Sequence, residues 1–389
     1  MFTPLIATLL AAVPALAVPA AAPQTTPTPA SGNIFAGKQI YANPYYASEI
    51  QNLAIPSLKP ELKTKAAAVA KVGSFAWLDT RAKVPSMDTY LANIKKANQA
   101  GSNPPILGAF VVYNLPDRDC AALASNGELA IANNGVALYK GYIDSIAAII
   151  RKYPDVSIAL TIEPDSLGNM ITNMNVPKCQ NAAAAYKDCI VYAMKNLNFN
   201  NVKMYLDAGH AGWLGWPANL QPSANIFAEV YAAAGKPASV RGLAINVSNY
   251  NAWKASTCPS YTQGNANCDE NRYVNAFAPL LTAAGFPANF IVDTGRSGKT
   301  PTGQQAWGDW CNAKGTGFGL RPSTNTGSPF VDSFVWIKPG GESDGTSNSS
   351  AIRFDSTCVR GSALTPAPEA GTWFQAYFEQ LLVNANPAF

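Results

Sequence analysis

Apolar runs alternate with helical patterns along the 389-residue chain. The runs are rich in β-branched residues, and most are too continuous for strands that keep one face in water. Seven occur, at 73–78, 106–113, 156–162, 202–206, 240–246, 290–292 and 333–337. Helical patterns lie between them, as over 136–153 and 181–197. We therefore expect an α/β protein built on a parallel sheet or barrel of seven strands.

Charge and composition narrow the classes of function. The chain carries 28 Lys and Arg against 24 Asp and Glu, and this formal net charge of +4 argues against nucleic-acid binding. Hydrophobic residues make up 48% and charged residues 13%, which is ample for a large buried core. Because a β/α barrel can exceed ~250 residues as one unit, we expect a single domain.

His210 is the only histidine. Metal cages, Ser-His-Asp triads and Cys-His dyads all place His beside other groups, so at most one such site could exist. The cysteines form no C-x-x-C pair, which argues against zinc and against a redox dithiol. We expect no metal and no cofactor, and the chemistry available is that of carboxylates.

The chain begins with an apolar run that ends in Ala15-Leu16-Ala17, a small-x-small pattern typical of signal cleavage. We interpret 1–17 as a signal peptide, 18–32 as a Pro/Thr/Ala-rich tether and 33–389 as the folded domain. No later apolar run approaches the ~18 residues of a membrane helix. The sequence therefore predicts a secreted, extracellular protein with no membrane span.

Seven cysteines fit an oxidising destination, and the odd count leaves one unpaired. Cys189 lies on the core-facing side of the helical pattern 181–197, so we expect it to be a buried free thiol. The other six lie in loop-like segments.

Polar residues follow nearly every predicted strand. In β/α barrels the carboxyl ends of the strands converge on the face where active sites are built. A ring of carboxylates on that face indicates acid/base chemistry, although Asp and Asn after a strand are also common turn and helix-capping residues. The ring comprises Asp79, Asp117, Asp119, Glu163, Asp165, Asp207, His210, Asn246, Asn249, Asp293, Lys338, Glu342 and Asp344.

Tryptophans accompany this ring. Indoles in Gly-rich loops are good platforms for the apolar faces of sugar rings, while carboxylates and amides bond the hydroxyls. Candidates are Trp77, Trp213, Trp216, Trp307 and Trp310, and buried loop anchoring is the plainer reading of Trp253, Trp336 and Trp373.

Several long segments resemble glycoside hydrolase family 6. The signature-like stretches are VVYNLPDRDCAALASNG at 111–127 and LTIEPDSLG at 160–168, and the resemblance extends over roughly 33–389. It implies a distorted seven-stranded parallel β/α barrel of TIM-like type. It also implies inverting hydrolysis of β-1,4-glucan, with cellulose and cello-oligosaccharides as partners and cellobiose released from non-reducing chain ends.

The resemblance assigns catalytic roles residue by residue. Asp165 corresponds to the general acid, and Asp119 to the carboxylate that raises its pKa and helps to position the water. Tyr113 corresponds to the tyrosine that distorts the sugar ring, and Ser125 to the serine that holds the catalytic water. Asp344 corresponds to the Asp proposed as base.

Substrate-binding roles follow in the same way. Trp77, Asp79, Lys338 and Glu342 match the subsite that holds the departing cellobiose. Trp213, Trp216 and Trp310 match the platforms on the other side. From their places in the polar ring we expect Asp207, His210 and Asn249 to bind substrate as well.

Disulfides between Cys120 and Cys179 and between Cys311 and Cys358 follow the family pattern. The remaining pair, Cys258 with Cys268, rests on elimination and on the short loop that it closes.

The sequence is compatible with three activities: an exo-acting cellulase with a loop-covered tunnel, an endo-acting relative with an open cleft, and a non-catalytic glucan-binding protein. Full-length loops at 115–132 and 340–358 favour the tunnel, and the retained carboxylates disfavour the binding protein. We expect a monomer with no separate cellulose-binding module.

Overall fold

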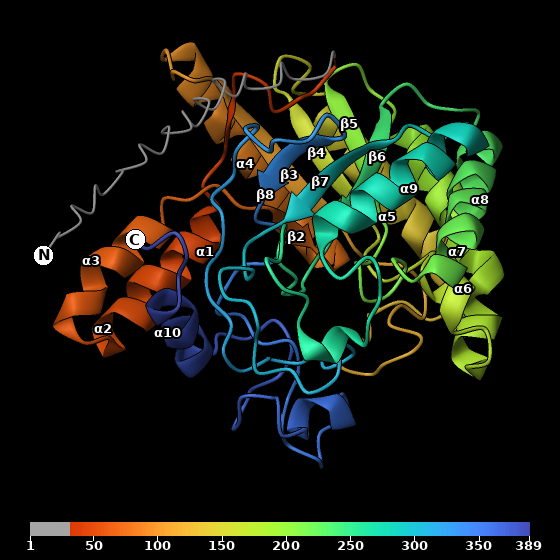
Figure 1. Cartoon of the computed structure of the whole chain (residues 1–389). Helices are drawn as coiled ribbons and strands as arrows, with labels where there is room; N and C mark the ends of the chain where they lie inside the picture. Colours follow the sequence, from red (N-terminus) through yellow and green to blue (C-terminus); the bar gives the residue numbers. More distant parts are fainter. Residues whose placement is uncertain (1–31) are drawn as a thin grey trace, which may run out of the picture.

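An eight-stranded sheet forms the centre of the computed structural model, which describes residues 32–389 (Figure 1). Its order is β1-β3-β4-β5-β6-β7-β8, and β2 also pairs with β3. The strands are β1 (Gln39–Ile40), β2 (Ala76–Leu78), β3 (Ile106–Val112), β4 (Ile158–Ile162), β5 (Val202–Asp207), β6 (Val240–Ile245), β7 (Asn289–Asp293) and β8 (Val331–Val335). The expected signal peptide and, apart from Gly32, the expected tether lie outside the described residues.

The seven predicted strands correspond to β2 to β8, and the pairings are parallel as expected. The additional strand β1 has two residues, which is too short for a periodic pattern to show in the sequence. It pairs with the first residues of β3, whereas β2 pairs with the last ones. A backbone hydrogen bond of 2.9 Å from Phe75 N–H to Trp336 C=O links the two ends of the curled sheet. This confirms the distorted seven-stranded barrel.

The sheet is buried on both faces. Along β3, Phe110 and Val112 belong to the core under the helices, whereas Leu107, Ala109 and Val111 belong to a second cluster inside the curled sheet. This two-residue alternation is that of any strand, but here both sides are apolar because helices cover the outside.

Helices surround the sheet and pack against one another in chain order (Figure 1). None in the described part of the chain is long and apolar enough to cross a membrane. They are α1 (Pro44–Glu49), α2 (Ile55–Ser57), α3 (Pro60–Val69), α4 (Val84–Gln99), α5 (Gly135–Ile150), α6 (Asn169–Thr172), α7 (Pro177–Asn196), α8 (Pro217–Ala233), α9 (Glu270–Ala284) and α10 (Gln375–Val383).

The two ends of the domain pack together. Helices α1 and α3 share a buried cluster with α10, to one side of the sheet in Figure 1. Tyr46 on α1 donates its hydroxyl hydrogen to Gly340 C=O at 2.7 Å, so this cluster also contacts the loop that follows β8.

All three expected disulfides are present, and Cys189 is the buried free thiol. One expectation is wrong, because Cys179 lies in the first turn of α7 rather than in a loop. The helix begins at Pro177, and proline suits the first helical position because its fixed φ fits and no N–H is needed there.

Candidate active site

Several polar residues in the segments after β3, β4 and β6 adopt a left-handed backbone. The φ angles are 58° at Asp119, 49° at Glu163, 57° at Asp165 and 60° at Asn246. For a residue other than glycine this conformation costs about 1–3 kcal/mol, so surrounding contacts must hold it. Its recurrence at one end of the sheet shows that the expected ring of polar residues is built by the fold.

Asp165 and Asp207 form the centre of this ring. Asp165 N–H donates to Asp207 Oδ2 at 3.0 Å, and Gly209 N–H donates to the same oxygen at 3.3 Å. Burial raises the pKa of Asp207 to about 7, although these two bonds favour its charged form. The pKa of Asp165 is raised well above its usual range by burial and then by the charges of Asp207 and Asp119. Asp165 therefore keeps its proton longer than Asp207.

Asp165 has an accessible side chain, and those of Asp119 and His210 are half-buried. Protein nevertheless surrounds all three closely enough for desolvation to be the leading influence on their pKa values. Each of the three side chains thus reaches solvent and is also closely surrounded by protein.

Asp119 is enclosed by its own loop. Ser125 N–H donates to Asp119 Oδ2 at 2.7 Å, so the loop folds back over the carboxylate. Burial raises the pKa of Asp119, while the Ser125 N–H and the Lys178 charge oppose that rise. Asp119 thus remains more basic than an ordinary aspartate.

Two basic residues that the sequence analysis did not single out brace this loop. Lys178 Nζ donates to the carbonyls of Arg118 and Asp119 at 3.0 and 3.1 Å. The Arg118 guanidinium lies 4.2 Å from the centre of the Tyr113 ring and donates to the carbonyls of Ser125 and Tyr113. The sequence could have pointed to them only by position, because Arg118 directly precedes Asp119 and Lys178 directly precedes Cys179.

Glu163 connects the ends of β3 and β4. The side chain is fully buried and accepts hydrogen bonds from the N–H groups of Asn114 and Leu115 and from the Tyr139 hydroxyl. Burial raises its pKa to about 7. Glu163 is a structural acid that holds the start of the Asp119 loop.

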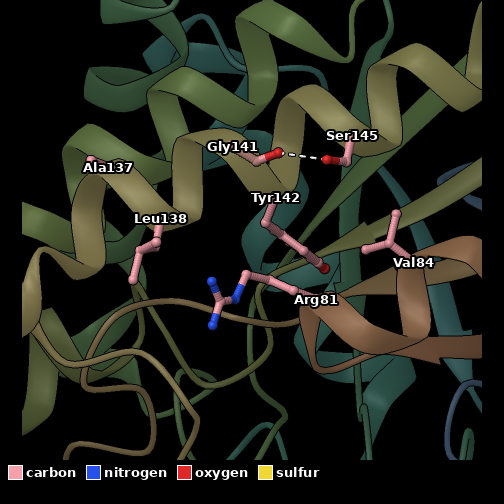
Figure 2. A pocket seen from close by; sticks show the side chains of 7 residues that line it. All are labelled: Arg81, Val84, Ala137, Leu138, Gly141, Tyr142 and Ser145. Atoms are coloured by element: carbon pink, nitrogen blue, oxygen red, sulfur yellow. Dashed lines mark hydrogen bonds between the residues drawn. The ribbon is translucent and has the colours of Figure 1, made fainter.

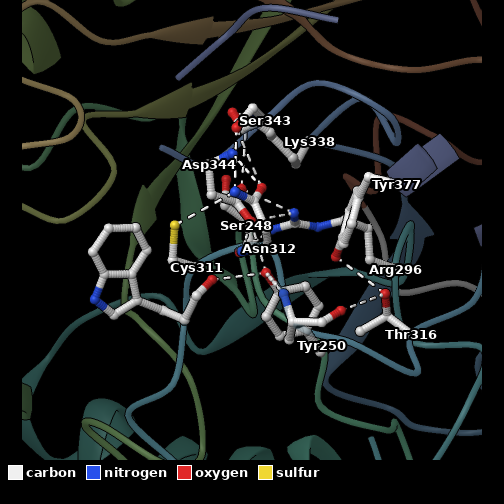
Figure 3. A network of polar contacts seen from close by, with 12 residues as sticks. Ser248, Tyr250, Arg296, Cys311, Asn312, Thr316, Lys338, Ser343, Asp344 and Tyr377 are labelled. Carbon is white, nitrogen blue, oxygen red and sulfur yellow. Dashed lines mark hydrogen bonds and ion pairs between the residues drawn. The ribbon is translucent and has the colours of Figure 1, made fainter. Parts of the chain in front are cut away.

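Asp344 has the opposite environment (Figure 3). Arg296 Nη1 lies 2.9 and 2.8 Å from its two oxygens, and Asn312 N–H donates to it at 2.9 Å. The Tyr250 hydroxyl lies 2.7 Å from Asp344 Oδ2 and 2.7 Å from Trp310 C=O. Burial alone would raise the pKa of Asp344, but Arg296, then Lys338, outweigh it and lower the pKa. The carboxylate is ionised and weakly basic.

Residues that the resemblance assigns to the departing cellobiose lie together. The Trp77 indole N–H donates to Ile337 C=O at 2.8 Å, and its ring stands edge-on to Tyr113 at 5.3 Å between centroids. Lys338 Nζ lies 6.0 Å from the Trp77 ring, and Asp79 pairs with Lys83 at 2.7 Å. Residues from β2 and from the loop after β8 therefore meet.

Glu342 has a partner that the sequence did not reveal. It shares a hydrogen bond with Glu49 at the end of α1, where burial and then the Glu342 charge raise the pKa of Glu49 to about 8. Burial also raises the pKa of Glu342, so both carboxyl groups favour their protonated forms. The two residues are 293 positions apart in the chain, so no local pattern could have joined them.

Tryptophans line the other side. Trp213 and Trp216 are half-buried, and Trp213 is fixed by an indole bond to Thr172 Oγ1 at 2.7 Å. Trp310 is half-buried as well. Trp307 was expected as a platform, but it is only 5% exposed and packs 6.1 Å from Trp216. It is a loop anchor, because its faces are covered.

The remaining expected residue on this side, Asn249, is 5% exposed, and its Oδ1 accepts the N–H of Tyr250 at 2.8 Å. Over residues 32–389 no group of three or more His, Cys, Asp or Glu side chains could hold a metal ion.

A separate cavity of about 220 Å³ lies against α4 and α5 (Figure 2). None of its lining residues belongs to the expected site. The Tyr142 hydroxyl in its wall accepts Tyr113 N–H at 3.3 Å, so the cavity lies behind the strand end that carries Tyr113. It is lined by Arg81, Val84, Ala137, Leu138, Gly141, Tyr142 and Ser145.

Comparison with known proteins gives one consistent result. Residues 35–385 match the family described as Glycosyl hydrolases family 6. The chain is 69% identical to a probable 1,4-beta-D-glucan cellobiohydrolase C of Aspergillus fumigatus over 359 residues, which cover 92% of this chain and 79% of the relative. Against the 1,4-beta-D-glucan cellobiohydrolase C of Emericella nidulans, identity is 66% over 368 residues, covering 94% and 81%.

Solved structures agree with the sequence relatives. The catalytic core domain of the Chaetomium thermophilum cellobiohydrolase Cel6A has a TM-score of 0.91 at 64% identity and covers 92% of this chain and 99% of that one. A Humicola insolens cellobiohydrolase II in complex with glucose and cellotetraose has a TM-score of 0.91 at 60% identity, covering 92% and 100%.

Proposed function

We propose how this chain, which belongs to glycosyl hydrolases family 6 and is a cellulose-hydrolysing enzyme that releases cellobiose, carries out its reaction. It works by inversion, starts from non-reducing chain ends and holds the chain in a loop-covered tunnel. The observation that carries the mechanism is the contrast among its strand-end aspartates. Burial and neighbouring carboxylates raise the pKa of Asp165 well above its usual range, whereas Arg296 and Lys338 lower that of Asp344.

Asp165 is the general acid. Departure of a sugar oxygen requires a proton, and a carboxylic acid can supply it only if it is still neutral at the working pH. Burial and the neighbouring charges of Asp207 and Asp119 keep Asp165 neutral. Its exposed side chain leaves room for a glycosidic oxygen beside it.

The attacking water belongs near Asp119 and Ser125. An inverting enzyme needs space for this water, with ~6.5–9.5 Å between its acid and base carboxyls. Of the two candidates to receive the proton, Asp119 is the more basic, because burial raises its pKa while Arg296 lowers that of Asp344. We propose that Asp344 acts mainly as a fixed negative charge that stabilises the cationic sugar ring of the transition state.

The tunnel is supported by contact between its two roof loops. A Cβ atom on Gly345 would lie 2.9 Å from Ala124 Cβ and 2.6 Å from Cys358 Sγ, so the backbone of one loop packs directly on the other. Each loop is tied down by its own disulfide, Cys120–Cys179 or Cys311–Cys358. A roof of this kind admits a chain end and excludes the middle of a chain.

The anomeric form of the first product tests the mechanism. Early NMR spectra during cellotetraose hydrolysis should show newly formed cellobiose as the α-anomer, which then equilibrates with the β-anomer. Initial β-anomer would reject inversion and imply a covalent intermediate.

A viscosity assay tests the tunnel separately. With a soluble substituted cellulose, viscosity should fall slowly relative to the sugar released, because internal bonds are not reached. A rapid fall would instead identify an endo-acting enzyme with an open cleft.

We further propose that the enzyme is secreted and monomeric. Three disulfides fit an oxidising compartment. The large exposed apolar side chains, such as Leu53, Met174 and Val383, are scattered along the chain, which is normal for a monomer.

A further inference from the structure

A buried acid lies outside the catalytic group and is not used by the proposed mechanism. Glu270, the first residue of α9, is fully buried. Its Oε1 accepts Ala211 N–H at 2.9 Å and Asn251 Nδ2–H at 2.7 Å, and its Oε2 has no hydrogen-bond partner. Burial raises its pKa to about 8. Burying a carboxyl group costs free energy unless its hydrogen bonds compensate. The two bonds of Glu270 reach the loops after β5 and β6, so the acid ties these loops together.

The orientation of Asn251 follows from its neighbours. The Trp307 indole N–H, which can only donate, lies 2.8 Å from Asn251 Oδ1. The amide oxygen must therefore face Trp307, and the amide nitrogen must face Glu270 and His210. Asn251 Nδ2 lies 2.7 Å from Glu270 Oε1 and 3.3 Å from His210 Nδ1, so each of its hydrogens has an acceptor.

The same reasoning fixes the proton of His210. Gly212 N–H donates to His210 Nδ1 at 3.1 Å, and Asn251 Nδ2 approaches the same atom. A ring nitrogen that faces two donors must be the unprotonated one, so a neutral ring carries its hydrogen on Nε2. Burial supports the neutral form, because it lowers the pKa of His210 to about 3. With Nδ1 occupied, Nε2–H is the donor left for a ligand.

We propose that Asn251, held in orientation by Glu270, is a positioning residue that fixes His210 as the neutral Nε2–H tautomer, which donates to a sugar hydroxyl on the Trp213 side of the cleaved bond. The sugar part of this statement rests on the proposed function. His210 follows Asp207 by three residues, and its ring centroid lies 6.3 Å from that of Trp213, so the histidine lies close in the chain to the acid pair and close in space to a tryptophan platform.

The lone histidine makes the tautomer directly measurable. Protein labelled with ¹⁵N-histidine and prepared without added histidines gives the two ring signals of His210 only. The wild-type protein should show hydrogen on Nε2 and none on Nδ1. Asn251→Asp keeps the shape and the Trp307 acceptor but replaces the donor with a carboxylate. It should move the hydrogen to Nδ1 or charge the ring.

Kinetics connect the tautomer with sugar binding. Losing one hydrogen bond of this kind should lower kcat/KM for cellotetraose about tenfold in Asn251→Asp, mostly through KM. Glu270→Ala should cause a similar loss by freeing Asn251 and Ala211. Glu270→Gln keeps a neutral acceptor in place, as expected of a protonated acid, and should restore most of that loss.

Asp332→Asn is the matched control. Asp332 is also a buried acid, and it bonds Arg241 and Tyr205 away from His210. This variant should lower the melting temperature and leave the His210 signals unchanged. A wild-type hydrogen on Nδ1, or an unchanged tautomer in Asn251→Asp, would overturn the proposal. Absence of cellobiose release with the expected tautomer would instead refute the proposed function, together with the sugar-binding part of this inference.

Discussion

Asp165 and Asp344 follow strands of the same sheet, yet their surroundings shift their pKa values in opposite directions. Burial and the charges of Asp207 and Asp119 raise the pKa of Asp165 well above the usual range, and no cation among residues 32–389 offsets them. Asp344 meets Arg296 and Lys338, so its pKa falls despite burial. Neighbouring charge, rather than residue type or position after a strand, therefore decides which aspartate has a raised pKa and can act as an acid.

Removing the acid should have the largest effect. Asp165→Asn cannot protonate the departing sugar, and general acid catalysis contributes ~10²–10⁴-fold to such rates. We expect a loss of that size in kcat for cellotetraose. The loss should shrink for an aryl cellooligosaccharide whose activated leaving group needs no proton. An equal loss on both substrates would contradict the assignment of Asp165.

Breaking the ion pair at Asp344 should cost stability. Arg296→Met leaves a buried carboxylate without its cation, a change that typically destabilises by about 3–5 kcal/mol. Thermal or urea unfolding measures this loss. The double variant Arg296→Met/Asp344→Asn should recover part of it, because no buried charge is then unpaired. Failure to recover any would show that packing around Arg296, and not the pair, matters.

The two aspartates should also affect stability with opposite signs. The folded-state pKa of Asp165 is raised, so the unfolded chain loses this proton first and stability declines as pH rises above ~3.9. Asp165→Asn should therefore raise the melting temperature at neutral pH. The folded-state pKa of Asp344 is lowered, so its contribution is present above ~3.9 and is lost as pH falls through the folded pKa. Asp344→Asn should lower the melting temperature at neutral pH.

A surface variant provides the reference for these scans. Glu229→Gln removes an exposed partner of Lys187 and should stay within about ±0.5 kcal/mol. Shifts of the same sign in Asp165→Asn and Asp344→Asn would refute the contrast between the two sites.

The smallest expected effect concerns Asp119. Its charge helps to raise the pKa of Asp165, so Asp119→Asn should let Asp165 ionise at lower pH. The upper limb of the pH profile of kcat/KM should therefore move to lower pH. A misplaced water could also lower the rate, but that change would not shift the limb. A limb that stays in place would mean that Asp207 and burial alone set the pKa of Asp165.

Much of this site was accessible from the sequence. Continuous apolar runs predicted β2 to β8, because a parallel strand buried on both faces needs no polar alternation. Polar residues after those runs predicted a site at one end of the sheet. The resemblance supplied the disulfide pairs of Cys120 and Cys311, and a short loop supplied that of Cys258.

The expectations that failed depended on packing. Trp307 was placed among the platforms because it shares a Gly-rich loop with Trp310, but only the fold shows that Gly212 and Trp216 cover it. Strand β1 was missed because two residues carry no period. Arg118 and Lys178 were not predicted, because no sequence motif distinguishes a basic residue that braces a loop from other basic residues.

The apolar runs and the polar residues after them were enough to predict the sheet and the set of strand-end acids. Which of these acids favour their protonated form depends on contacts that exist only after folding. Arg296 reaches Asp344 across 48 residues, Glu49 reaches Glu342 across 293, and Glu270 reaches His210 through Asn251 from another element. Apolar periodicity is a local property that a strand or helix carries in its own residues. A pKa or a tautomer depends on burial and on charges and donors within a few ångströms, and folding brings these together from distant positions.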